Sequence, residues 1–104
     1  MRKRYEIWDA HVKFEDSNQV ETHPVIIWNE TTVITIGYKI TSTNRGDEGE
    51  EFRIKHWKES GLDHESSIRL RKVVRLEEKD FIRRRGILDE RERVRLDLRL
   101  SVIQ

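Results

Sequence analysis

Apolar residues recur at every second position near the start of the chain, which is the spacing of a β-strand. Between Tyr5 and Phe14 they alternate with polar or charged residues, and this segment is predicted to be a strand. Residues 15–21 carry acidic and small polar side chains without an apolar period, so they are predicted to form a solvated loop.

The segment 23–43 is predicted to be a buried β-hairpin around which the rest of the chain is organised. It holds two apolar runs rich in β-branched residues, Val25–Trp28 and Thr32–Ile36. The pair Asn29-Glu30 between them is the predicted turn. Small polar or titratable side chains stand at both ends of the hairpin, so its rim is where chemistry is expected.

Shorter elements and a connection rich in turn-forming residues are predicted after the hairpin. In chain order they are the connection 44–49, a strand over Glu51–Lys55, a helical turn over Lys58–Gly61, one or two strands over Ser66–Leu76 with a kink near Arg71-Lys72, and a short helix over Glu77–Arg85 that ends at Gly86.

Two patterns compete in the C-terminal segment. Asp89 followed by Glu92 is a plausible helix N-terminus, and the many Arg, Glu and Leu residues favour helix. From Val94 to Val102, however, apolar residues alternate strictly with polar ones, which is a strand pattern. The pattern alone favours strand.

Composition narrows the class of protein without identifying it. The chain has 104 residues, which predicts one domain over 1–104, and its net charge of +1 excludes a uniformly basic coat for nucleic acid. Cysteine is absent, so neither disulfides nor thiolate metal sites are expected. No apolar run approaches the roughly 18 residues of a membrane span. A cytoplasmic protein that does not enter membranes is the plain interpretation.

An ordered set of short motifs carries a further signal. The set is Ile7-Trp8, His23-Pro24-Val25-Ile26-Ile27, Ile40-Thr41-Ser42, Phe52-Arg53-Ile54-Lys55, Ser60-Gly61-Leu62, Ser66-Ser67-Ile68-Arg69-Leu70, Val73-Val74-Arg75-Leu76 and Gly86-Ile87-Leu88. In order and spacing this set resembles the MazF/PemK family of toxin endoribonucleases from type II toxin–antitoxin systems. The resemblance covers nearly the whole chain, although no single motif is specific.

The resemblance implies an α+β, mostly β fold: a small SH3-like barrel of the CcdB/PemK type with a short helix and a C-terminal helix. It implies a homodimer that cleaves single-stranded RNA without a metal or cofactor, and a cognate antitoxin that occupies the RNA groove. Because the family's C-terminal element is a helix, 89–102 is predicted to be helical despite its alternation.

One departure from the family concerns the expected active site. The family usually has an arginine before the strand proline, acting with a threonine in the strand that ends in threonine-serine. This chain has His23 at the first position and Thr41 at the second. A histidine is better suited than an arginine to moving protons, and the hydroxyls of Thr41 and Ser42 could hold a phosphate oxygen. His23, Thr41 and Ser42 are therefore the candidate catalytic residues.

Positive charge for the RNA must then come from elsewhere. Arg45 and Arg53 are the candidates to replace the missing arginine, and Arg69 is a further candidate phosphate contact. No metal site is predicted, because Asp63, His64 and Glu65 are adjacent residues that seldom converge on one ion. Each of these side chains also has an ordinary interpretation: rim, strand end or solvated face. The alternative function is accordingly an inactive binding module for a partner protein or nucleic acid.

Overall fold

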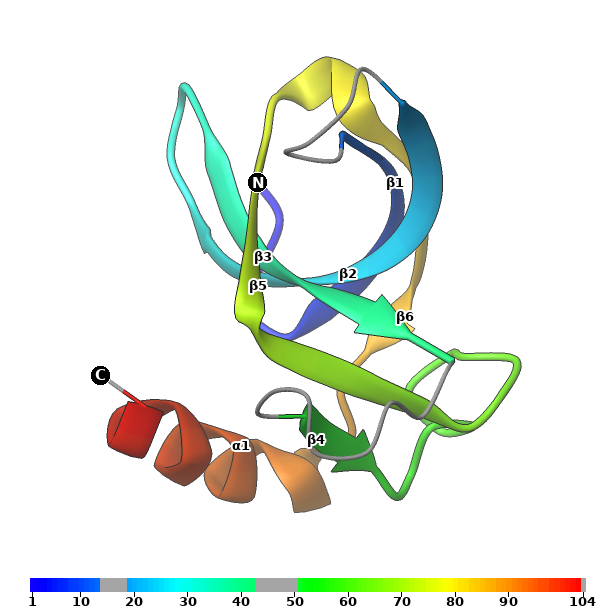
Figure 1. Cartoon of the computed structure of the whole chain (residues 1–104), viewed down its shortest axis with the longest axis vertical. Coiled ribbons are helices and arrows are strands. Elements are labelled where there is room, and N and C mark those ends of the chain that lie inside the picture. The colour runs from blue at the N-terminus through cyan, green and yellow to red at the C-terminus, as the bar shows by residue number, and fades with distance from the viewer. Residues whose placement is uncertain (14–18, 43–50, 104) are drawn as a thin grey trace.

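The computed structural model describes residues 1–13, 19–42 and 51–103. In this part of the chain six strands form one antiparallel sheet with the order β4-β5-β3-β2-β1-β6, and a C-terminal helix lies beside β4 (Figure 1). The elements are β1 (Glu6–Lys13), β2 (Val20–Glu30), β3 (Thr35–Thr41), β4 (Glu51–Ile54), β5 (Ser66–Leu76), the 3₁₀ helix η1 (Glu78–Asp80), β6 (Phe81–Ile87) and α1 (Glu90–Ile103). The predicted mostly-β fold with a C-terminal helix is confirmed.

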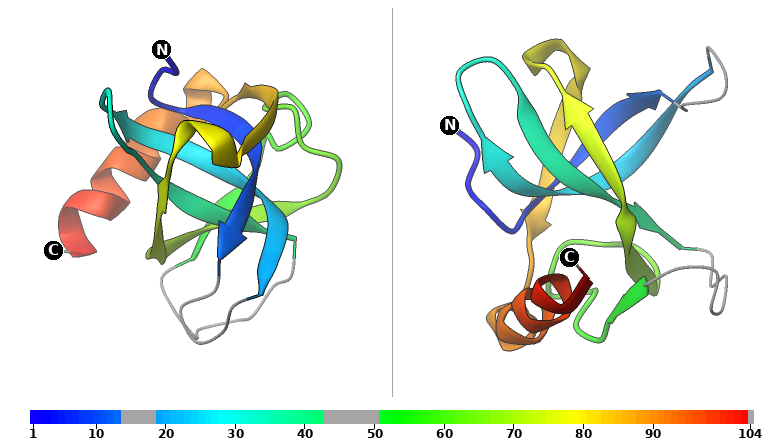
Figure 2. Two further views of the ribbon diagram at one scale, coloured as in Figure 1. Left: turned by 90° about the horizontal axis from the view of Figure 1, so that it is seen from above. Right: turned by 60° about the vertical axis from the view of Figure 1, so that its left-hand side comes forward.

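The sheet curls into a barrel-like shape because a short connection joins two strands that are far apart in it. β5 and β6 are consecutive along the chain but are separated by three strands in the sheet. Strands lie about 4.8 Å apart, so a flat sheet would hold the two roughly 19 Å from each other. Only 77–80 connect them, mostly as the compact η1, which rises about 2 Å per residue. The sheet therefore bends until the end of β5 meets the start of β6 (Figure 2).

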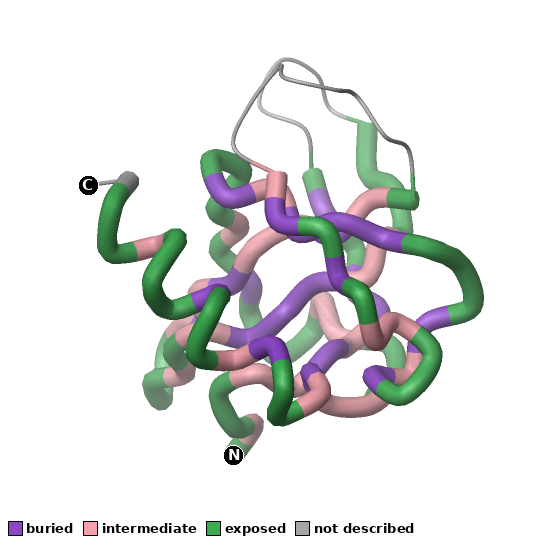
Figure 3. Tube along the Cα trace, turned by 90° about the horizontal axis from the view of Figure 1, so that it is seen from below, coloured by how far each residue is buried: buried purple, intermediate pink, exposed green. Residues whose placement is uncertain are grey.

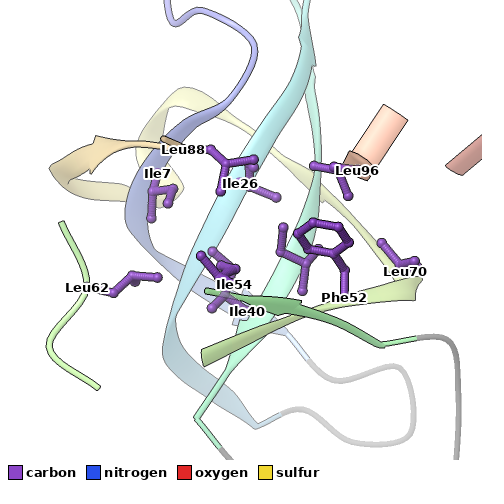
Figure 4. Packing of buried hydrophobic residues seen from close by; sticks show 10 residues of the cluster. Ile7, Ile26, Ile40, Phe52, Ile54, Leu62, Leu70, Leu88 and Leu96 are labelled. Carbon is purple, nitrogen blue, oxygen red and sulfur yellow. The ribbon is translucent and has the colours of Figure 1, made fainter. Parts of the chain in front are cut away.

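Both faces of β2 are buried, which explains its unbroken apolar run. Ile26 belongs to the larger core between the sheet and α1, which Figure 4 shows closely. Val25 and Ile27, which alternate with it, belong to a smaller core with Ala10 and Leu76 inside the curl. Side chains alternate across a strand, so apolar residues on both faces are needed where both faces are covered. Figure 3 shows the resulting buried stretch through the middle of the molecule.

The hairpin prediction is confirmed, but the prediction of its turn at Asn29-Glu30 is wrong. β2 continues through Asn29 and Glu30, and residues 31–34 make the turn. The Thr31 hydroxyl accepts the backbone N–H groups of Val33 and Ile34 and donates to the Ile34 carbonyl, which closes the turn locally. Glu30 stays in the strand because Arg2 binds its carboxylate at 2.8 Å. A partner distant in sequence thus overrides the local turn preference.

The predicted helix over Glu77–Arg85 is wrong apart from its first turn. Only η1 is helical, and β6 follows it and pairs with β1. The basic residues of β6 meet acidic residues of β1: Arg83 Nε lies 3.0 Å from Asp9 Oδ2, and Arg84 Nε lies 3.8 Å from Glu6 Oε1. β1 offers a strand edge and opposite charge, which favour strand over the local helix preference.

The C-terminal helix prediction is confirmed, and the helix explains the alternation in its sequence. Leu96 is buried and Leu100 packs against the larger core, while Val94, Leu98 and Val102 are exposed. Alternate positions in a helix fall about 200° apart, so an alternating pattern makes one buried and one exposed apolar stripe. Asp89 accepts the Arg91 N–H as expected of a cap. The buried Glu92, in contrast, accepts the N–H groups of Lys55 and His56.

The other predictions are met with small corrections. The first strand and β4 are confirmed, and Val20 and Glu21 belong to β2 instead of a loop because they pair with the end of β1. The helical turn over 58–61 is present and closes at Gly61, whose φ is 91°. β5 is one strand whose register against β3 shifts between Tyr38 and Ile40, opposite the predicted kink. Phe14, the loop 15–18 and the connection 44–49 lie outside the described residues.

Candidate functional site

The three predicted catalytic residues line one pocket of about 400 Å³. We call it the His23 pocket. Five strands and residues 62–64, between β4 and β5, contribute to it. Its lining is Asp9, Thr22, His23, Pro24, Ile40, Thr41, Ser42, Leu62, Asp63, His64, Ser66 and Arg85. Two larger hollows in the described part of the chain, of about 550 and 870 Å³, include none of the predicted catalytic residues.

His23 is held on β2 opposite Ala10 of β1, and its side chain is 22% exposed. Its Nε2 lies 3.1 Å from Oε1 of Glu21. A carboxylate only accepts hydrogen bonds, so Nε2 carries a hydrogen and Nδ1 is the basic nitrogen of the neutral ring. Burial, together with the positive charge of Lys39, lowers the pKa of His23 below its ordinary value, and Glu21 opposes this only in part. The ring is consequently neutral, and able to take a proton, in neutral solution.

Thr41 and Ser42 lie where β3 ends. Thr41 is the last residue of the strand and pairs with Ser67 of β5, and Ser42 follows it in an exposed bend. Both residues reach the same pocket as His23. The pocket therefore combines an imidazole with two hydroxyl groups, as the sequence predicted.

Two of the three predicted arginines, Arg53 and Arg69, do not line this pocket. Arg45 lies outside the described residues. Arg53 is exposed on β4 and pairs with Ser67, which also pairs with Thr41, so Arg53 stands two strands from Thr41 in the same row. Two strand spacings are about 10 Å. Arg69 forms an ion pair with Glu51 at 3.4 Å, with both side chains largely buried. RNA contacts by these arginines stay predictions.

Instead, the pocket contains an arginine that the sequence interpretation missed as a site residue. Arg85 comes from β6, and its side chain is 13% exposed. It is held by Asp9 and Asp63, with Nη1 at 3.4 Å and Nη2 at 2.7 Å from their carboxylate oxygens. A usable signal was present: on a strand, alternate residues of Phe81–Ile87 share a face, and β1 carries complementary acids. The helix prediction concealed it.

Two glycines hold the turn segment, residues 56–64, against β6. A Cβ at Gly61 would overlap the carbonyl oxygen of Arg85, and a Cβ at Gly86 would overlap that of Ser60. The positive φ of Gly61 is also a conformation that other residues rarely adopt. This close approach lets Arg85 Nε donate to the Gly61 carbonyl at 3.2 Å. It also brings Asp63 and His64 to the pocket.

Carboxylates and imidazoles occur here, but the described residues contain no group of three or more His, Cys, Asp or Glu side chains that could hold a metal ion. No helix in the described part of the chain is long and apolar enough to cross a membrane.

The curled antiparallel sheet and the C-terminal helix define a small, mostly β protein with a barrel-like fold, and the pocket lies where β2 begins and β3 ends. The family model described as PemK-like, MazF-like toxin of type II toxin–antitoxin system matches residues 3–103, so the chain belongs to that family. The resemblance inferred from the motifs is thereby confirmed. No curated protein matches the chain. A toxin of such a system has an antitoxin as its partner.

Proposed function

We propose that this toxin is an endoribonuclease that cleaves single-stranded RNA in the His23 pocket without a metal ion. The observation that supports the proposal is that His23 on β2 and Thr41 and Ser42 at the end of β3 line a single pocket. Metal-free cleavage of RNA needs a base, an acid and donors facing the phosphate, and the pocket contains side chains of each kind.

In the proposed reaction Nδ1 of His23 takes the proton from the ribose 2′-OH. The 2′-oxygen forms a bond to phosphorus while the bond from phosphorus to the 5′-oxygen breaks. The products are a 2′,3′-cyclic phosphate and a free 5′-hydroxyl. The hydroxyl groups of Thr41 and Ser42 donate hydrogen bonds to the non-bridging phosphate oxygens, where negative charge increases in the transition state.

The leaving 5′-oxygen also needs a proton. We assign that role to His64, because it is the second imidazole in the pocket lining. His64 comes from the turn segment, whereas His23 comes from β2, so the two imidazoles approach from different elements. Base and acid on different elements suit a substrate that runs between them.

We further propose that two copies form a homodimer whose groove takes single-stranded RNA, and that the cognate antitoxin inhibits it by occupying that groove. Arg45, Arg53 and Arg69 extend the contacts to phosphates beyond the pocket. The substrate is mRNA, which makes the cytoplasm the place of action. Light scattering of the purified protein checks the dimer. A monomer that also lacks affinity for RNA would contradict this proposal.

The second candidate function is a binding module of the same fold that has lost catalysis. Replacement of the family's arginine by His23 is the observation that favours it. The two functions separate on substitution. If His23→Ala removes cleavage, the enzyme is supported, whereas cleavage that first appears with His23→Arg supports the binding module.

The deciding experiment is incubation of the purified protein with 5′-labelled single-stranded RNA in EDTA between pH 5 and 9. We expect fragments that end in a 2′,3′-cyclic phosphate, identified by mass spectrometry. The His23→Ala protein is the control for contaminating nucleases. RNA that stays intact over the whole pH range would overturn the enzymatic function.

A further inference from the structure

The guanidinium of Arg85 is a preformed phosphate-binding group whose position is set by three contacts. Nε donates to the Gly61 carbonyl, Nη1 lies near Asp9 and Nη2 lies near Asp63. A guanidinium presents five N–H donors in a rigid planar fork that fits carboxylates and phosphates equally well. A group that holds two carboxylates in a pocket can hold a phosphate in place of one of them.

The two carboxylates differ in how firmly they are held. Asp9 is buried in β1 and also binds Arg83 at 3.0 Å, so it is part of the sheet's own packing. Asp63 lies on the turn segment, and its side chain is 70% exposed. Exposed ion pairs contribute little to stability and exchange easily with solvent ions. Asp63 is therefore the carboxylate that can give way.

The charge of the pocket makes this exchange necessary for an anionic substrate. Among the residues that line it, Asp9 and Asp63 are acidic and Arg85 alone is permanently basic. The two carboxylates outnumber the guanidinium, so a phosphate binds less favourably as long as Asp63 stays in place. Once the Asp63 carboxylate moves away, a negatively charged phosphate oxygen can take its place beside Nη2 of Arg85.

From these contacts we infer that Arg85 binds the scissile phosphodiester of single-stranded RNA and that Asp63 occupies the phosphate position in the free protein until RNA displaces it. This inference rests on the proposed function. Arg85 also supplies, from β6, the fixed positive charge that His23 does not provide. Arg85 touches the reacting phosphate, whereas Asp9 positions Arg85.

Binding of a fluorescein-labelled 2′-O-methyl RNA, measured by fluorescence anisotropy at several salt concentrations, tests the inference without requiring cleavage. We expect Asp63→Asn to tighten binding about 2- to 5-fold, the value of an exposed ion pair. We expect Arg85→Gln to weaken binding about 10-fold or more and to reduce the slope of log affinity against log salt by about 0.7, as loss of one phosphate contact does on a single strand. Arg85→Lys keeps the charge and should recover part of the affinity.

Arg84→Gln is the matched control, because Arg84 is the neighbouring arginine on β6, pairs with Glu6 and does not line the His23 pocket. If Arg85→Gln binds no more weakly than Arg84→Gln, the role of Arg85 is overturned. Unchanged RNA affinity in the Asp63→Asn variant overturns the displacement of Asp63. Because this variant replaces an exposed side chain, the test stays valid even if Arg85→Gln unfolds.

Failure of the inference and failure of the proposed function give different results. A wild-type protein that leaves unmodified RNA intact, yet binds the 2′-O-methyl RNA through Arg85, overturns the nuclease function and supports the phosphate site. If the Arg85→Gln variant cleaves RNA at the wild-type rate, this inference is overturned and the nuclease function stands.

Discussion

The Nε2 atom of His23 lies 3.1 Å from Oε1 of Glu21, two residues earlier on β2. Residues two apart on a strand share a face, so this contact follows from the strand itself. Glu21 favours the protonated ring, while burial and Lys39 disfavour it, and the balance leaves the pKa of His23 below its ordinary value. The charges of Glu21 and Lys39 thus adjust the pKa of the proposed base, and both residues can be replaced by mutation.

Changing either neighbour should shift the pH dependence of cleavage in a defined direction. Lys39→Met removes a positive charge, so the pKa of His23 rises and the acidic limb of log kcat/KM moves to higher pH. Glu21→Gln removes the partner of the protonated ring, so the pKa falls further and the limb moves to lower pH. Lys58→Met, at an exposed position in the turn segment, is the control. Identical profiles for all three would show that His23 does not titrate in the reaction.

Removing the hydroxyl group of Thr41 should slow cleavage by about 100- to 1,000-fold, the cost of one lost transition-state donor. Thr41→Val keeps the shape of the side chain, and Thr41→Ser restores a hydroxyl and should recover most of the rate. Thr32→Val in the exposed hairpin turn is the matched control. Single-turnover kinetics measure the effect, with thermal melting to check the fold. A Thr41→Val protein as fast as the control would remove Thr41 from the site.

Replacing His64 should lower cleavage more than RNA binding, because we assign it a proton and not a phosphate contact. Cleavage by His64→Ala should fall about 100-fold, within the usual range for a general acid. Affinity for the 2′-O-methyl RNA should stay near that of the wild type. An RNA in which sulfur replaces the leaving 5′-oxygen should largely rescue the variant, because a thiolate leaves without being protonated. Absence of that rescue would count against His64 as the acid.

Loss of the buried Glu92 carboxylate should destabilise the fold, because two backbone N–H groups and a guanidinium would lose their acceptor. Glu92 is 1% exposed and accepts the N–H groups of Lys55 and His56 at 2.8 and 2.6 Å. Glu92→Leu should lower the free energy of unfolding by about 2–5 kcal/mol, as expected when two backbone donors and an arginine lose a buried carboxylate acceptor. Glu90→Gln, which is exposed on the same helix, should change it by less than about 0.5 kcal/mol. Urea denaturation measures both.

Substitution of Gly61 separates backbone strain from crowding. Gly61→Ala should destabilise the fold by more than about 1 kcal/mol, because alanine is strained at positive φ. Asparagine tolerates that conformation, so Gly61→Asn would recover stability if φ were the whole cause. Since any Cβ there would overlap the Arg85 carbonyl, we expect no recovery. Recovery in Gly61→Asn, with Lys58→Ala as control, would show that β6 yields to the added carbon.

The parts of the fold that could be predicted from sequence are those whose patterns are local. The apolar runs of β2 and β3 and the alternation in β1 mark strands wherever they pack. The turn at 31–34 and the strand β6 could not be predicted in this way. Both depend on partners distant in the chain: Arg2 holds Glu30, and the acids of β1 meet the arginines of β6. The alternation in α1 was ambiguous because it fits a strand and a two-striped helix alike.

The same distinction between local patterns and distant contacts applies to the residues of the candidate site. His23, Thr41 and Ser42 could be found because they stand at the ends of recognisable strands and match a family pattern. The helix prediction concealed Arg85, whose place depends on the pairing of β6 with β1. Asp9 and Arg83, which are in contact across these two strands, are 74 positions apart in the chain. Asp63 and His64 reach the pocket only because the turn segment packs closely on β6.

That long separation has a consequence for how the protein is made. The lining of the His23 pocket begins at Asp9 and is completed by Arg85, so a growing chain holds its imidazole and hydroxyl groups well before the guanidinium has been synthesised. Pairings between distant segments form slowly, because loop closure must come first. A ribosome must therefore synthesise at least residues 9–85 before the pocket can form, and a truncated translation product that ends before β6 would lack both the charge and the curl of the finished barrel.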